Sequence, residues 1–238
     1  MSPHASSWLA WSLAGSSVVM FVASVALFVL ARSAQVPGSL SASRTVIDLL
    51  VGVPVLAFPL VGALIASRRP HNPIGWICLA EGFLWMFLTM IDYYGVYGLA
   101  SPGSVPFPVV IYALAQWLWV PTVGLLAIYL VLLFPDGRLP SRRWRPLAWL
   151  SGAVILLVSV TQGLIPGPLP DLGGTRNPFG LEGAPWVADA ANAILVVFLL
   201  CIPASATSLI VRYWRSRGRS ASRSSGYLSP PHSWGWGS

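Results

Sequence analysis

Six apolar runs dominate this sequence, and each is long enough to cross a lipid bilayer as a helix. A hydrocarbon core of about 30 Å needs about 20 apolar residues at a rise of about 1.5 Å per residue. The runs do not alternate between polar and apolar positions, so transmembrane strands are not expected. The predicted helices cover approximately residues 8–31, 46–67, 75–99, 108–134, 146–165 and 187–213.

The composition supports a membrane protein and excludes two other classes. Of the 238 residues, 55% are hydrophobic and only 9% are charged, whereas a soluble domain has about 25% charged residues. The mean hydropathy of +0.72 also excludes a disordered chain. The predicted fold is therefore all-α: a polytopic membrane protein whose residues 1–214 form a six-transmembrane-helix bundle. Pro54, Pro59, Pro121 and Pro203 fall inside predicted helices, where we expect kinks.

The placement of arginine predicts the orientation of these helices. All 14 basic residues are Arg, and the net charge is +7. Most lie in the loop after the second helix, in the loop after the fourth helix and in the C-terminal tail. Basic residues gather on the cytoplasmic side of membrane proteins. Both termini are therefore predicted to be cytoplasmic, although Arg32 and Arg44 in the first outer loop run against the rule.

Two loops on the predicted cytoplasmic side carry distinctive motifs. Residues 68–76 read Arg-Arg-Pro-His-Asn-Pro-Ile-Gly-Trp, and Asn72 followed by Pro73 is typical of a helix start. Residues 133–146 read Leu-Phe-Pro-Asp-Gly-Arg-Leu-Pro-Ser-Arg-Arg-Trp-Arg-Pro, in which Pro-Asp-Gly predicts a tight turn. Two interpretations stay open: turns with ordinary cytoplasmic charge, or loops that couple the bundle to a partner. The coupling candidates are Asn72, Pro73, Asp136, Arg138, Arg142 and Arg143.

A shorter motif repeats the first one on the opposite side of the membrane. Asn177-Pro178-Phe179-Gly180 occupies in the second three-helix half the place that Asn72-Pro73 occupies in the first. An inverted-topology repeat, as found in many transporters, would produce this pattern. Chance is the other explanation for so short a match.

Taken together and in this order, these motifs resemble the membrane-embedded N-terminal region of sensor histidine kinases of bacterial two-component systems, common in actinobacteria. The resemblance covers roughly residues 46–218. It implies a multi-helix input module in the bacterial cytoplasmic (inner) membrane, whose last helix continues into a cytoplasmic linker and a kinase core.

The C-terminal tail departs from this family pattern. Residues 215–238 are basic and rich in Ser, Pro and Trp, and we expect them to be disordered. No helix with a phosphoacceptor His and no Gly-rich ATP lid follows, so the chain is predicted to have no enzymatic activity. A shifted reading frame from Arg219 onward can be chosen that gives Glu-Arg, then Gln-Trp-Leu and an apolar run. One hypothesis is therefore a frameshift near Gly218 that truncates a longer receptor, and the alternative is a genuine short tail.

Acidic residues in the third predicted helix are candidates for a sensing site. An ionised group inside the membrane costs about 2.5–3.5 kcal/mol on insertion scales, so it needs a reason. Glu81 and Asp92 are about three turns apart and share one helix face. We predict a polar, aromatic-lined pocket in the outer half of the bundle for an unknown amphipathic small-molecule ligand, such as a quinone or a lipid. The alternative is interhelical hydrogen bonding plus an aromatic belt. The candidates are Glu81, Asp92, Tyr93, Tyr97, Gln116 and Trp117.

Signatures of other functions are missing from the sequence. It has no phosphate-binding Gly loop, no Gly-x-Ser-x-Gly elbow and no Cys or His cluster, so no cofactor and no metal site are expected. Cys78 and Cys201 fall inside apolar runs and are interpreted as small buried hydrophobic residues. No segment is typical of a nucleic-acid reader.

The predicted function is that of a membrane sensor or input module of a histidine-kinase-like receptor. Its expected partners are the lipid bilayer, a second copy of the chain through the helices, and the ligand. A small transporter or permease-like component, and a stand-alone membrane modulator, are the alternatives.

Overall fold

The computed structural model describes the backbone of residues 3–33, 46–169 and 174–225, and the side chains of 4–31, 50–169 and 174–212. The elements are α1 (Pro3–Ser33), α3 (Val46–Val55), α4 (Ala57–Arg68), α5 (Pro73–Ala100), α6 (Pro108–Gly124), the π-helical segment η1 (Leu125–Leu130), α7 (Val131–Leu133), the 3-10 turn η2 (Arg142–Trp144), α8 (Arg145–Gly163) and α9 (Trp186–Ser225). Across these ranges there is no strand, only an isolated antiparallel bridge between Pro168 and Arg176.

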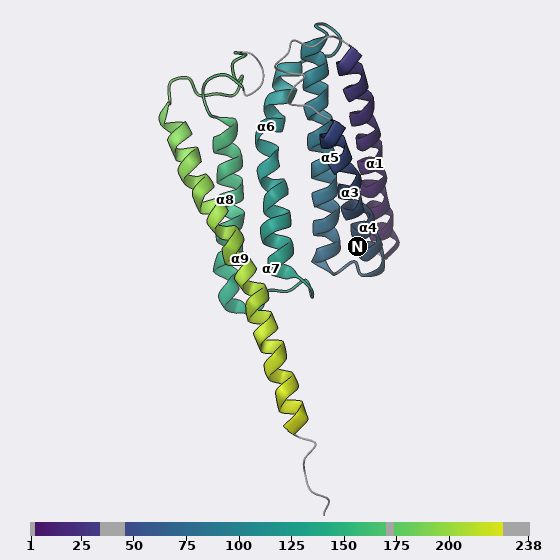
Figure 1. Ribbon diagram of the computed structural model, residues 1–238, viewed down its shortest axis with the longest axis vertical. Helices are drawn as coiled ribbons and strands as arrows, with labels where there is room; N and C mark the ends of the chain where they lie inside the picture. The colour runs from purple at the N-terminus through teal and green to yellow at the C-terminus, as the bar shows by residue number, and fades with distance from the viewer. Residues whose placement is uncertain (1–2, 34–45, 170–173, 226–238) are drawn as a thin grey trace, which may run out of the picture.

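Six helical stretches are long and apolar enough to cross a membrane, which confirms the predicted all-α, six-span fold. They are His4–Ala31, Leu50–Arg68, Pro73–Ala100, Pro108–Leu133, Arg142–Gly163 and Trp186–Arg212. The helices lie side by side along one axis (Figure 1). We call the end at which α9 leaves the bundle the tail end, and the opposite end, with residues 101–107, 164–169 and 174–185, the far end.

The second predicted span is two helices. α3 ends at Val55 and α4 begins at Ala57, with Leu56 in a turn between them. Pro59 explains the break, because its ring clashes with the carbonyl four residues earlier and it has no N–H to donate. The kink expected at Pro59 is therefore present as a helix break.

The spans pack as two three-helix halves. In the first half, α1, α4 and α5 all contact one another, and in the second half α9 contacts α7, η1 and α8 while α6 contacts α8. The halves meet mainly where α5 lies against α6 and η1. Figure 1 shows the same division, with α1, α3, α4 and α5 on one side and α8 and α9 on the other.

Glycines set the distance between helices in the first half. A Cβ added at Gly62 of α4 would lie 2.6 Å from the backbone nitrogen of Leu79 in α5, and one added at Gly75 would lie 2.8 Å from the nitrogen of Ala66. Gly82 meets the ring of Pro59 in the same way. Small residues permit such close approach between membrane helices, where apolar burial gives no net driving force.

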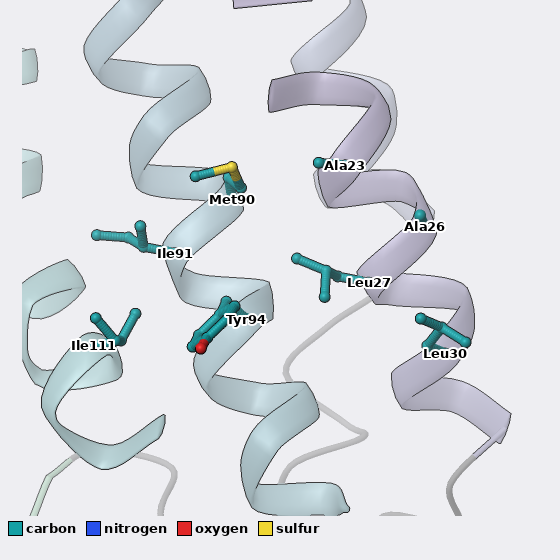
Figure 2. A pocket seen from close by; sticks show the side chains of 8 residues that line it. All are labelled: Ala23, Ala26, Leu27, Leu30, Met90, Ile91, Tyr94 and Ile111. Atoms are coloured by element: carbon teal, nitrogen blue, oxygen red, sulfur yellow. The ribbon is translucent and has the colours of Figure 1, made fainter. Parts of the chain in front are cut away.

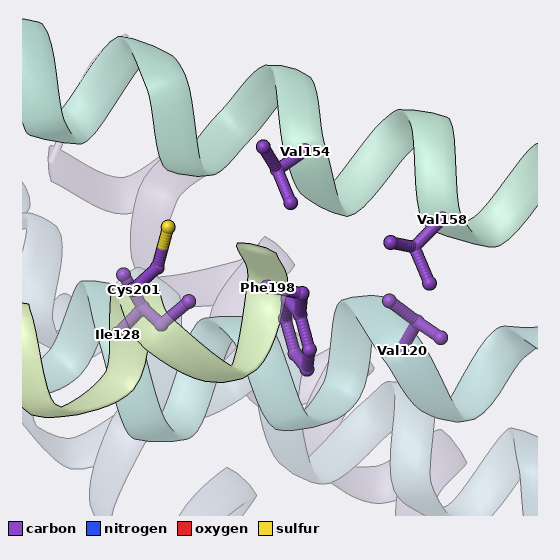
Figure 3. Close-up of a cluster of buried hydrophobic side chains, with 6 residues drawn as sticks. All are labelled: Val120, Ile128, Val154, Val158, Phe198 and Cys201. Carbon is purple, nitrogen blue, oxygen red and sulfur yellow. The ribbon is translucent and has the colours of Figure 1, made fainter. Parts of the chain in front are cut away.

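The second half is held by a cluster of large apolar side chains. Phe198 of α9 is fully buried and lies among side chains from α6, η1 and α8 (Figure 3). The ring of Trp119 packs edge-on against Phe198 with centroids 6.5 Å apart. The cluster consists of Val120, Ile128, Val154, Val158, Phe198 and Cys201.

Hydrogen bonds to backbone carbonyls join η1 to its neighbours. Ser205 of α9 donates to the carbonyl of Ala127 at 3.2 Å, and the Tyr129 hydroxyl donates to the carbonyl of Ala148 in α8 at 2.8 Å. η1 follows Pro121, the proline expected to distort this span. Interhelical bonds of this kind stabilise helix packing in membranes by about 1 kcal/mol each.

Helix α9 is longer than the sequence predicts. Its backbone remains helical through Ser225, so residues 215–225, assigned to a disordered tail, are helical instead. The reason is local: this stretch has no proline, and Arg is a good helix former. Residues 226–238, Arg44, and the side chains of Arg32 and of residues 213–225 lie outside what the structure describes.

Candidate functional site

Among the described Asp, Glu and Arg side chains, that of Glu81 is the most deeply buried. It lies on α5, is 2% exposed, and its Oε2 atom has no hydrogen-bond partner in the part of the chain that the structure describes. Asp92 is half-buried on the same helix. They are eleven positions apart in the sequence, which corresponds to roughly 16 Å along the helix axis. Eleven positions are also close to three helical turns, so the two residues lie on one face of α5 at different levels along its axis.

The predicted aromatic residues beside Asp92 are packing residues. Tyr93 is 2% exposed, and its ring packs edge-on against Phe28 of α1 with centroids 5.6 Å apart. Tyr97 packs against a buried cluster that contains Val96 and Tyr112. These contacts join α1, α5 and α6 in the far half of the bundle.

An apolar groove lies next to these residues, between α1, α5 and α6. Its volume is about 530 Å³, and its walls are aliphatic apart from Tyr94 (Figure 2). The hydroxyl of Tyr94 donates to the carbonyl of Pro106 at 3.1 Å. None of the six predicted sensing residues lines this groove. Its residues are Ala23, Ala26, Leu27, Leu30, Met90, Ile91, Tyr94 and Ile111.

A smaller, more polar cavity lies between α6, α8 and the loop at the far end. Its volume is about 300 Å³, and the predicted Gln116 lines it together with Gln162 and Asn177. Trp117 lies beside it, since a Cβ added at Gly163 would be 3.0 Å from the Cδ1 atom of Trp117. The structure thus brings Gln116 and Trp117 to one place, apart from Glu81.

Asn177 organises the wall of this cavity. Its Nδ2 donates to the carbonyls of Gly163 and Ile165, both at 2.9 Å, and its Oδ1 accepts from the backbone nitrogen of Phe179 at 3.0 Å. The Asn177-Pro178 motif is a turn and starts no helix, because α9 begins only at Trp186. Sequence reasoning did not single out Gln162, and it interpreted Asn177 only as a repeat of the Asn72-Pro73 motif. The position of Gln162, a polar residue near the end of an apolar run, was the available signal for this cavity.

At the tail end, the two motif loops lie against each other. Asn72 caps α5 by accepting from the backbone nitrogen of Ile74 at 3.0 Å, and Pro73 is the first residue of the helix, as predicted. Gly137 packs directly on this cap: an added Cβ would lie 2.7 Å from Asn72 Oδ1 and 2.6 Å from Pro73 Cδ. Gly137 also has a φ of +70°, which favours glycine.

Arg212 of α9 binds the same turn from the other side. Its Nη2 donates to the carbonyl of Leu132, at the end of α7, at 3.1 Å and also to the carbonyl of Arg138. Its Nη1 lies 3.8 Å from Oδ2 of Asp136. A cation is well suited to this place, because the last carbonyls of a helix have no partner inside it. We call Asn72, Pro73, Asp136, Gly137, Arg138 and Arg212 the tail-end junction.

The junction contains four of the six predicted coupling residues. Arg142 and Arg143 are exposed in η2, and neither forms an ion pair with a described residue. Arg212, which the sequence presented only as one more basic residue near a span end, was missed as a contact residue. Its only signal was its place as the first Arg after the apolar run of the last span.

No metal site is found among the described residues, since no group of three His, Cys, Asp or Glu side chains lies together there. Comparisons with models of protein families, with curated proteins and with solved structures give no match to this chain.

Proposed function

We propose that this chain is the membrane sensor or input module of a histidine-kinase-like receptor and has no catalytic activity of its own. In this proposal the protein lies in a bacterial cytoplasmic membrane with the tail end, and hence both termini, in the cytoplasm. The resemblance of the loop motifs to such receptors supports the family, and the arginines at the tail end support the orientation.

The tail-end junction is the observation that carries this proposal. An input module must convert a change in helix packing into a movement of the helix that leaves the bundle. Here Arg212 ties that helix to the turn at residues 134–138, and Gly137 of that turn packs on the start of α5. A shift of α5 relative to α6 therefore acts on α9 through contacts between both halves.

The sensing end in this proposal is the polar cavity at Gln116, Gln162 and Asn177. A cavity of about 300 Å³ is at the small end of ligand sites, and its few amides fix the orientation of a small amphipathic ligand. It lies between α6 and α8, so an occupant acts on the second half, to which α9 belongs.

A chimaera tests the proposal. The dimerisation and catalytic core of a histidine kinase is joined in helical phase after Ser225, and autophosphorylation is measured in membrane vesicles with labelled ATP. Arg212→Gln removes two charge-assisted hydrogen bonds, so the output is expected to differ from wild type by about tenfold. Asp136→Asn is expected to have a smaller effect, since the Asp136 side chain is 74% exposed.

Glu182→Gln is the matched control, because it removes an exposed carboxylate paired with Arg176 at 3.4 Å at the far end. Its output is expected to stay within about twofold of wild type. The unfused chain is expected to give no signal above empty membranes. Equal output from all chimaeras, or labelling of the unfused chain, would contradict the proposal.

A transporter or permease-like component is the second candidate, and the division into two three-helix halves favours it. Such proteins bind substrate near the midplane, at the interface of their repeats. The two far-end cavities described above lie towards one end of the helices, which ranks this function below the sensor. A stand-alone modulator has no specific contact in its favour.

A further inference from the structure

A third cavity lies at the tail end, where the two loops meet the ends of α4 and α7. Its volume is about 350 Å³. Arg68, one of its lining residues, is the last residue of the second span, and Phe134 directly follows the fourth span. The cavity is therefore at the level where hydrocarbon gives way to lipid headgroups.

One side of this cavity is basic. Arg68 and Arg69 both line it, both are exposed, and neither forms an ion pair within the described part of the chain. Among the side chains that the structure describes, no carboxylate lines the cavity. Asp136, which directly follows the lining residue Pro135, is paired with Arg212. The cap of α5 at Asn72 also lines the cavity and adds the partial positive charge of a helix N-terminus.

The other side is apolar and open to the bilayer. Leu64 is 42% exposed and Phe134 is 54% exposed, and Ile65 and Pro135 complete this wall. An anion without an acyl chain would leave this wall uncovered. The apolar groove of Figure 2 offers the contrast, because none of the described residues that line it is basic.

We propose that this cavity binds one anionic phospholipid, with its phosphate at Arg68 and Arg69 and its acyl chain along Leu64 and Phe134. Basic pockets between transmembrane helices are suited to anionic headgroups. The binding site is independent of the proposed sensor function. The lipid would also contact Phe134 and Pro135, the first two residues of the turn held by Arg212.

The experiment is a titration of the purified full chain in neutral detergent with phosphatidylglycerol, in which bound lipid is counted by native mass spectrometry. The variant Arg68→Gln/Arg69→Gln is expected to bind about tenfold more weakly than wild type. The matched control is Arg142→Gln/Arg143→Gln, which removes two adjacent, exposed arginines at the same end that do not line the cavity. This control is expected to bind within about twofold of wild type. An equal loss in both double variants would assign the binding to general surface charge and overturn the proposal.

A second arm tests the acyl wall and does not depend on the arginines. Phe134→Ala is expected to weaken phosphatidylglycerol binding severalfold, and phosphatidylcholine is expected to bind the wild type far less than phosphatidylglycerol does. Glycerophosphoglycerol, the same headgroup without acyl chains, is expected not to displace the lipid. If this soluble anion competes as well as the lipid, or if Phe134→Ala binds like wild type, the site recognises phosphate alone and the lipid proposal fails.

Discussion

Single glycines decide how closely the helices of the first half approach. Gly62, Gly75 and Gly82 lie on the seam between α4 and α5, and at each of them a Cβ would meet atoms of the facing helix at less than 3 Å. The contacted atoms at Gly62 belong to the backbone, which cannot rotate away. Glycine at these positions is therefore a packing requirement.

The substitution Gly62→Leu is expected to destabilise the first half. The added side chain must separate α4 from α5, and overpacking of this kind costs about 1–3 kcal/mol, or a fall in Tm of about 5 °C or more. The measurement is loss of helical circular dichroism on heating the purified protein in detergent. Gly15→Leu makes the same change at an exposed site where no atom of the described residues lies within 4 Å of an added Cβ, and its Tm is expected to stay within about 2 °C of wild type. Equal shifts in both variants would disprove the packing argument.

Asn72 and Gln116 show how far single residues could be predicted. The cap at Asn72 depends on residues two apart in sequence, so the sequence predicted it correctly. The location of Gln116 in a cavity with Gln162 and Asn177 depends on how α6, α8 and a loop are placed. The predicted roles of Glu81, Asp92, Tyr93, Tyr97 and Trp117 in sensing stay predictions.

At the scale of elements, two loops are fixed by hydrogen bonds and close packing to the ends of helices. The loop between α8 and α9 is tied back on the end of α8 by Asn177, which makes three hydrogen bonds. The turn between α7 and η2 is held between the cap of α5 and Arg212 of α9. The first loop thus closes the polar cavity beside α8. The second connects α5 and α9, which are not its neighbours in sequence.

Replacing Asn177 by Ala is expected to loosen the far-end loop. The lost hydrogen bonds are worth about 1 kcal/mol each, and proteolysis follows the population of the open loop. Trypsin cleavage after the exposed Arg176 is expected to be about a hundredfold faster, as measured by the mass and yield of the fragment that ends there. Asn192→Ala, at an exposed position of α9, is the control and should be cut at the wild-type rate. If both variants are cut equally fast, Asn177 does not hold the loop.

At the scale of the whole molecule, orientation and function are linked. The sensor proposal requires the tail end to be cytoplasmic, because α9 extends beyond the bundle there (Figure 1). The placement of Arg residues in the loops at this end favours that orientation. In an inverted protein, the extension of α9 and the tail-end junction would lie outside the cell, where they could not act on a cytoplasmic kinase.

A cysteine accessibility experiment tests the orientation. Gly183→Cys lies in the exposed far-end loop with open space around it, and Arg143→Cys lies in the exposed η2 turn at the tail end. A membrane-impermeant maleimide is expected to label the first variant in intact cells and the second only after permeabilisation. Unsubstituted protein provides the baseline, since Cys78 and Cys201 are buried at 7% and 3% exposure. The reverse labelling pattern would contradict both the orientation and the sensor proposal.

The sequence by itself determined the number and approximate bounds of the spans, the cap of α5 and the all-α class. Each of these follows from hydropathy or from residues a few positions apart, and the cost of placing unpaired backbone in lipid leaves few alternatives. It did not determine the end of α9, because helix continuation into water depends on weak propensities.

Only the tertiary structure decided which loops touch, which residues share a cavity and what Arg212 binds. The carbonyls that Arg212 contacts belong to Leu132 and Arg138, separated from it by 80 and 74 residues. Such contacts depend on the rotation and depth of each helix relative to its neighbours. Those quantities are set by close packing at glycines and by the apolar cluster around Phe198, which the pattern of hydrophobic residues in a single helix does not encode.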